Sequence, residues 1–153
     1  MQIHGDTSGL SASETKALQR IYRRRVPLDR LTTPDLTRAL VGVSHSTGRQ
    51  VGVLADRSGR VHHVIIGDAS KLMLPDVGRL RAGAGRLRGL RLIHTHLRNE
   101  PLSRDDLVDL TRLRLDMVVA ICLAPGEERA LCIYYGHNFP SLEETNEPPF
   151  RTF

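Results

Sequence analysis

The sequence predicts a mixed α/β domain in which a sheet is flanked by helices. Short apolar runs typical of strands alternate with segments whose apolar residues recur at helical spacing. Two pairs of these runs are joined by short polar turns, as in β-hairpins. The longest apolar run, residues 116–124, is typical of a central strand buried on both faces. These patterns predict at least five strands and about three helices.

The N-terminal part of the chain is predicted to contain two helices. Ser11 and Glu14 form a capping box, which begins a short amphipathic helix that ends before Pro27. Thr33 followed by Pro34 begins a second helix, because threonine caps helices and proline suits their first turn. The second helix is expected to end near residues 46–48.

The remaining elements follow from apolar runs and turn residues. Residues 71–74 are a possible further strand, ended by Pro75. A helix is expected to begin at Ser103. The other predicted strands cover residues 51–55, 61–66, 92–97, 116–124 and 130–135.

We divide the chain into three parts. Residues 1–32 hold the first helix and a lead-in, of which residues 1–10 are polar and expected to be loose. Residues 33–136 form the main domain. Residues 137–153 are polar and contain several prolines, which is typical of a tail or linker.

Composition is that of a soluble globular protein of 153 residues, with 40% hydrophobic and 25% charged residues. No apolar run approaches the ~20 residues of a membrane helix, and the N-terminus does not resemble a signal peptide. The two cysteines, Cys122 and Cys132, lie in apolar runs and are predicted to be buried thiols. We therefore expect a cytoplasmic protein with no membrane partner.

The net charge of +5 is unevenly distributed. Between Asp76 and Glu100 the chain has several arginines and no acidic residue. Arginine suits phosphate binding, so these residues form either a solvated basic face or a surface that contacts RNA. Aromatic residues are sparse, which disfavours base stacking, and no DNA partner is expected. The candidate phosphate contacts are Arg23, Arg24, Arg25, Arg79, Arg81, Arg86, Arg88 and Arg91.

Two histidines and an aspartate form the candidate metal site. His94 and His96 are two residues apart in a predicted strand, so their side chains share one face. Asp106 lies at the start of the next helix and can turn back toward them. Two imidazoles and a carboxylate can hold zinc with one position left open for water. The alternative is a strand end with two exposed histidines, followed by a helix in which Asp106 interacts with the helix dipole.

The pattern H-x-H at residues 94–96, followed by S-x-x-D at residues 103–106, resembles the metal motif of the JAMM (MPN/JAB) metallo-isopeptidases and their bacterial RadC-like relatives. The resemblance implies a JAMM/MPN-like fold, in which His94, His96 and Asp106 hold zinc. It also implies that the Ser103 hydroxyl stabilises the oxyanion. The predicted order of helices and strands fits that fold.

The chain departs from the JAMM pattern at the catalytic glutamate. In that family a glutamate in an E-x-x-G strand activates the zinc-bound water. Aligning the chain on Gly52 places Arg49 at that position, with Gln50 beside it. Arginine cannot accept a proton at neutral pH, and next to a dication it would repel the metal. The spacing between His96 and Ser103 is also one residue shorter than usual, so the sequence predicts a degenerate metalloprotease motif.

A second resemblance spans most of the chain. It is similar to the N-terminal extension of some bacterial GTPases of the HflX family, which are ribosome-associated. The chain contains no GxxxxGK[ST] loop, so we expect no nucleotide site, and any GTPase activity would lie outside it. The chain would then be a fragment of such a GTPase or a free-standing version of the extension. The segments that carry this resemblance are residues 5–10, 22–27, 48–54, 87–91 and 94–97.

Three functions are compatible with these patterns. The first is a non-catalytic interaction module with a JAMM-like fold, which partners HflX-type GTPase domains in cis or in trans and contacts the ribosome or RNA through its arginines. The second is an active zinc-dependent peptidase or isopeptidase. The third is a domain that keeps zinc at His94, His96 and Asp106 for a structural or regulatory purpose.

Overall fold

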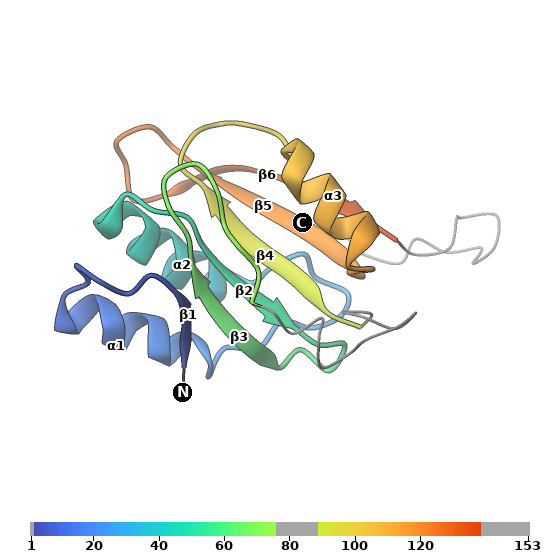
Figure 1. Cartoon of the computed structure of the whole chain (residues 1–153), viewed down its shortest axis with the longest axis horizontal. Coiled ribbons are helices and arrows are strands. Elements are labelled where there is room, and N and C mark those ends of the chain that lie inside the picture. Colours follow the sequence, from blue (N-terminus) through green and yellow to red (C-terminus); the bar gives the residue numbers. More distant parts are fainter. Residues whose placement is uncertain (1, 76–88, 139–153) are drawn as a thin grey trace.

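A computed structural model describes residues 2–75 and 89–138 of the chain. Figure 1 shows a mixed sheet with helices on both of its faces, so the predicted α/β fold class is confirmed. Within the described residues there are three helices, α1 (Ala12–Ile21), α2 (Pro34–Thr47) and α3 (Arg104–Arg112). The strands there are β1 (Ile3–Gly5), β2 (Val51–Ala55), β3 (Val61–Ile66), β4 (Arg91–His96), β5 (Met117–Leu123) and β6 (Ala130–His137).

The sheet has the strand order β1-β3-β2-β4-β5-β6. Both predicted hairpins are present, as the antiparallel pairs β2–β3 and β5–β6. Strand β4 joins the two hairpins, because it pairs antiparallel to β2 and parallel to β5. Every residue of β4 and β5 is buried, which confirms the prediction of a central strand at residues 116–124.

The helix starts follow the predicted capping residues. Ser11 and Ser103 each form a complete capping box, and the Thr33 side chain accepts a hydrogen bond from the backbone of α2. Helix α2 ends at Thr47 and is followed by the C-cap residue Gly48, whose φ of 67° is readily adopted by glycine. These local signals were sufficient to place all three helices.

Apolar side chains pack on both faces of the sheet. One cluster joins α1 and α2 to the sheet through residues such as Leu18, Leu40 and Val119. A smaller cluster lies on the α3 side, where Leu110 packs with Leu92 and its neighbours. The candidate metal ligands lie on this second face, so α3 covers the part of the sheet that carries them (Figure 1).

Two local predictions were wrong. Residues 3–5 are not loose, because they form β1, which pairs in parallel with β3 about sixty positions away. Residues 71–74 are not a strand. The Asp68 carboxylate accepts hydrogen bonds from the backbone of Ser70 and Lys71, so this segment turns instead of joining the sheet.

Other expectations have mixed outcomes. Cys122 is buried as predicted, but Cys132 is only half-buried. The division at residue 32 stays a prediction. Strand β1 belongs to the same sheet as the later strands, and α1 packs in the same apolar core as later residues. Residues 139–153, in the predicted tail, lie outside the described residues. Among the described residues, no helix is long and apolar enough to span a membrane.

Candidate metal centre

Strand β4 carries both histidines to one buried face of the sheet. His94 is 1% exposed and His96 is 4% exposed. The residue beside His94 on the neighbouring strand β2 is Gly52. A Cβ atom at this glycine would lie 2.8 Å from the His94 Cβ, so the missing side chain leaves room for the imidazole. The strand pattern and this glycine together position the pair.

Helix α3 supplies the carboxylate through its first turn. The Ser103 hydroxyl accepts a hydrogen bond from the backbone N–H of Asp106 at 3.0 Å. In return, the backbone N–H of Ser103 donates to Asp106 Oδ2 at 2.9 Å. The capping box therefore fixes the carboxylate orientation. It leaves both carboxylate oxygens facing the histidines.

The three side chains converge on one point. The Nε2 atoms of His94 and His96 lie 3.1 Å apart. Asp106 Oδ1 lies 3.1 Å from the His94 Nε2 atom, and Oδ2 lies 3.2 Å from the His96 Nε2 atom. These three residues form a buried group that could hold a metal ion, and their candidate ligand atoms all lie within 4.8 Å of one another.

The other nitrogen of each imidazole faces a backbone carbonyl. His94 Nδ1 lies 2.9 Å from the Val119 carbonyl oxygen, and His96 Nδ1 lies 3.0 Å from that of Glu100. Since a carbonyl oxygen can only accept, we assign a hydrogen to Nδ1 of each neutral ring. Both Nε2 atoms then carry lone pairs. Metal-bound histidines in proteins are held by such carbonyl contacts.

The charges of the group favour a bound cation. Burial alone would raise the pKa of Asp106, but its hydrogen bonds with His94 and His96 outweigh burial and hold that pKa well below its usual range. Burial alone would lower the pKa of His96, but the Asp106 carboxylate and the Glu100 carbonyl outweigh it and raise that pKa. An ionised carboxylate and two inward-facing nitrogens thus require positive charge at their centre, from a proton or from a metal ion.

A cavity of about 270 Å³ opens onto this group. His96, Ser103 and Asp106 line it from one side. Asp109, one helical turn beyond Asp106, also lines it, and burial together with the neighbouring Asp106 and Asp105 raises the Asp109 pKa. The remaining lining residues are Gln50, Ser70, Lys71, Leu72, Met73, Leu74, Asp105 and Leu113. A ligand could therefore approach the triad without unfolding the domain.

The interpretation that places Arg49 next to the metal is wrong. The Arg49 guanidinium donates hydrogen bonds to the carbonyl oxygens of Gly67 and Asp6, both at 2.6 Å. The side chain that lines the cavity is Gln50, which is 7% exposed. Gln50 immediately precedes β2, and side chains alternate along an extended chain, so Gln50 lies on the same face as Gly52, the register partner of His94. This alternation was the signal that could have identified Gln50 from the sequence.

The arginines predicted to contact phosphate differ in their exposure to solvent. Arg23, Arg24 and Arg25 follow α1 and are exposed. Arg91 cannot contact a phosphate, because its side chain is fully buried and its guanidinium donates to backbone carbonyls. The candidates outside the described residues are Arg79, Arg81, Arg86 and Arg88.

The fold and the site define a mixed α/β domain with a buried group of two histidines and one aspartate that could hold a metal ion. The chain matches no protein-family model, no curated protein and no solved structure.

Proposed function

We propose that this chain is a zinc-binding domain of the JAMM type that acts as a non-catalytic interaction module. One observation carries the proposal. Two imidazole Nε2 atoms and two carboxylate oxygens face one another at 3.1–3.2 Å, while both Nδ1 atoms are held by carbonyl oxygens. Acceptor atoms repel at that distance unless a cation lies between them.

The donor set favours zinc and an open coordination position. Imidazole and carboxylate are common zinc ligands, whereas calcium and magnesium prefer sites made only of oxygens. Zinc takes four ligands in most sites, and the three side chains supply three. The cavity beside the triad, lined by Ser103 and Gln50 among others, would give room for a fourth ligand. We propose that this ligand is a carbonyl or carboxylate oxygen of a partner.

The proposed domain binds its partner without hydrolysing it. Hydrolysis at zinc requires a group that takes a proton from the metal-bound water. On the β2 side the cavity is lined by Gln50, which immediately precedes that strand, and a neutral amide cannot accept a proton at neutral pH. The other carboxylates that line the cavity, Asp105 and Asp109, come from α3 and not from the strand that carries the glutamate in the JAMM pattern. The JAMM resemblance therefore supports the architecture of the site and not its catalytic activity. An active zinc peptidase is the alternative.

Metal analysis of the purified protein tests the proposal. We expect one equivalent of zinc, detected by plasma mass spectrometry, in the wild type after dialysis against zinc. His94→Ala and His96→Ala should both lose it. The matched control is His62→Ala, because His62 is an exposed histidine paired with Asp56 at 2.6 Å. Wild-type protein that retains no zinc would refute the proposal. One equivalent of iron in place of zinc would contradict the choice of metal.

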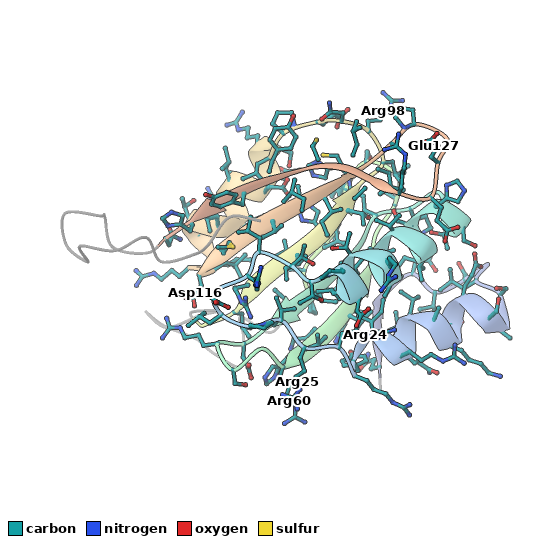
Figure 2. The ribbon with its side chains drawn as sticks, turned by 180° about the vertical axis from the view of Figure 1, so that it is seen from behind. Arg24, Arg25, Arg60, Arg98, Asp116 and Glu127 are labelled. Atoms are coloured by element: carbon teal, nitrogen blue, oxygen red, sulfur yellow. The ribbon has the colours of Figure 1, made fainter. Side chains whose placement is uncertain are left out.

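A second candidate function is binding to ribosomal RNA, as expected for a partner of HflX-type GTPase domains in the cytoplasm. The specific observation is a group of exposed arginines. Arg25 follows Arg23 and Arg24, and its backbone pairs with that of Arg60. Figure 2 shows Arg25 and Arg60 together at one edge of the molecule. Clustered guanidinium groups bind phosphates and release counterions.

Salt dependence tests this candidate function. Binding to large ribosomal subunits should weaken as the salt concentration rises. Arg24→Gln and Arg25→Gln should each reduce the slope of log K against log salt concentration by about one. Arg38→Gln is the control, because Arg38 forms an ion pair with Asp35 on α2. Binding that does not depend on salt, or that Arg38→Gln weakens equally, would contradict an RNA contact at this group.

A further inference from the structure

The two cysteines lie directly opposite each other in the β5–β6 hairpin. Cys122 pairs with Cys132 in the antiparallel register, and both are free thiols. Side chains of opposed residues lie on the same face of a sheet. Cys122 is also the register partner of His96 in the parallel pair β4–β5. A row of His96, Cys122 and Cys132 therefore crosses three adjacent strands next to the candidate metal centre.

Both thiols hold the loop that supports His96. The Cys122 thiol donates to the Glu100 carbonyl oxygen at 3.2 Å, and the same oxygen faces His96 Nδ1 at 3.0 Å. The Cys132 thiol donates to Asn99 Oδ1 at 3.0 Å. The thiols are thus two of the contacts that fix the loop between β4 and α3.

We propose that Cys122 and Cys132 form a dithiol–disulfide site that exchanges with low-molecular-weight disulfides. Directly opposed residues of an antiparallel pair have Cα atoms about 4.5–5.5 Å apart. Disulfides form across Cα separations of about 4.4–6.8 Å, so the register of the hairpin already meets this requirement.

The exchange proceeds in two balanced steps. The thiolate of Cys132, the more exposed cysteine, attacks one sulfur of the small disulfide and releases one small thiol. The Cys122 sulfur then attacks the mixed disulfide on Cys132, gives up its proton and releases the second small thiol. The protein loses two electrons and two protons, and the small disulfide gains them.

The order of the two steps follows from the environment of each sulfur. Burial raises the pKa of the Cys122 thiol to about 11. Cys122 is therefore a poor first nucleophile at neutral pH, because the thiolate is the reactive form. Once Cys132 carries the mixed disulfide, the proximity of the two sulfurs favours the second step.

Oxidation would withdraw two donors from the loop. A disulfide carries no S–H, so the Glu100 carbonyl and the Asn99 side chain would each lose one hydrogen bond. Asn99 Oδ1 would keep the bond from the Tyr134 hydroxyl. Looser support of Glu100 weakens the orientation of His96. This consequence rests on the proposed zinc function, and it predicts a zinc affinity reduced by up to about tenfold.

The experiment that tests the site uses the full chain and glutathione disulfide. After incubation, peptide mapping by mass spectrometry should detect a cross-link between Cys122 and Cys132, with two hydrogens lost. Denaturant unfolding should remain cooperative, which shows that the bond forms in the folded protein. Cys132→Ser keeps a donor for Asn99 and should gain no cross-link. Two unmodified thiols, or glutathione retained on Cys132, would overturn the proposal.

Zinc affinity measured in both redox states tests the coupling separately. The oxidised wild type should bind zinc more weakly than the reduced wild type. Cys132→Ser should bind equally before and after treatment. Equal affinity in both states of the wild type would overturn the coupling. A chain that binds no zinc in either state would refute the proposed function and the coupling, while the cross-link result would still decide the exchange site.

Discussion

Polar side chains are buried at both ends of strand β4, but their charges are compensated in different ways. At the start of the strand, Arg91 is fully buried. At its end, His94 and His96 are almost fully buried beside Asp106. Buried polar groups are costly unless they are paired, so each end needs charges and hydrogen bonds that balance.

At the Arg91 end the chain itself supplies acceptors for the two terminal guanidinium nitrogens, while Arg91 Nε has no hydrogen-bond partner among the described residues. The guanidinium donates to the Val26 carbonyl oxygen at 2.7 Å and to the Asp56 carbonyl oxygen at 3.1 Å. It also donates to the carbonyls of Pro27 and Arg30 at 3.1 and 3.3 Å. Burial lowers the pKa of Arg91, while the Asp116 and Asp56 carboxylates oppose that effect. This end ties the segment after α1 to the β2–β3 turn.

The histidine end differs. Its carbonyl contacts use the Nδ1 hydrogens, so the two Nε2 atoms and the Asp106 carboxylate need a proton or a metal ion between them. A guanidinium carries its own positive charge, whereas the triad is balanced by a bound proton or could be balanced by a metal ion. The comparison teaches that a buried arginine in a cage of carbonyls brings its own charge and ties segments together, whereas two imidazoles converging on a carboxylate form a group that can bind a cation.

The largest expected effect separates binding from stability at the histidine end. Asp106→Asn keeps the shape of the side chain but removes its charge. Loss of a residue that only supports a ligand lowers metal affinity about 10–100-fold, so loss of a ligand's charge should lower zinc affinity about a thousandfold or more. The free energy of unfolding without metal should change by less than about 1 kcal/mol, because the amide can donate to a neighbouring Nε2. Zinc titration and denaturant unfolding measure the two quantities. Unchanged zinc affinity would contradict a metal-binding role for the histidine end.

The opposite pattern is expected at the Arg91 end. Arg91→Met leaves buried carbonyl oxygens without a donor and should lower the free energy of unfolding by about 3 kcal/mol. Zinc stoichiometry should not change. Arg38→Met is the control, because Arg38 and its ion-pair partner Asp35 are both exposed, and the change should cost less than about 1 kcal/mol. Equal costs for the two variants, measured by urea unfolding, would contradict a structural role for the buried cage.

The sequence predicted the histidine end better than the Arg91 end for a physical reason. His94, His96 and Asp106 are brought together by a strand period and a helix cap, which are local rules. The cage of Arg91 comes from carbonyls up to 65 positions away in the chain, which no local pattern reports. In the sequence Arg91 therefore resembled the other arginines of its basic segment.

The same distinction explains the other errors. Strand β1 forms only because its three residues pair with β3, far along the chain. Arg49 was predicted to lie at the metal site, where the structure has Gln50, because the alignment on Gly52 followed the E-x-x-G spacing of the JAMM motif. The period of two along β2 would have placed Gln50 on the His94 face. Local capping, turn and strand signals were sufficient for the helices and both hairpins, but tertiary contacts decided which polar side chains are buried.

A paired substitution sharpens the assignment of the cavity wall. Gln50→Glu adds a carboxylate to the wall and should raise zinc affinity by roughly tenfold, comparable with the effect of one opposite charge on a pKa. Arg49→Glu should leave zinc affinity unchanged and should lower the free energy of unfolding by about 1–2 kcal/mol, because two hydrogen bonds to carbonyls are lost. Isothermal titration compares the two variants with the wild type. A larger gain from Arg49→Glu would restore the earlier alignment.

The smallest expected effect is acid sensitivity near Arg91. Burial alone would raise the pKa of Asp56, but hydrogen bonds from Ser58, His62 and the Arg60 N–H outweigh it and hold that pKa well below its usual range. The ionised carboxylate therefore contributes stability that is fully present above the unfolded pKa of 3.8 and is lost as the pH falls below it.

Asp56→Asn isolates this contribution, because the two proteins are identical at every other titratable group. The variant should be less stable by about 1 kcal/mol at neutral pH, a value that allows for partial exposure. The difference should shrink as unfolding is repeated from pH 5 to pH 2. Ser58→Ala removes one donor and should give a smaller change in the same direction. A difference that does not vary with pH would mean that the Asp56 carboxylate stabilises the β2–β3 turn without its charge, leaving the carbonyl cage alone to balance Arg91.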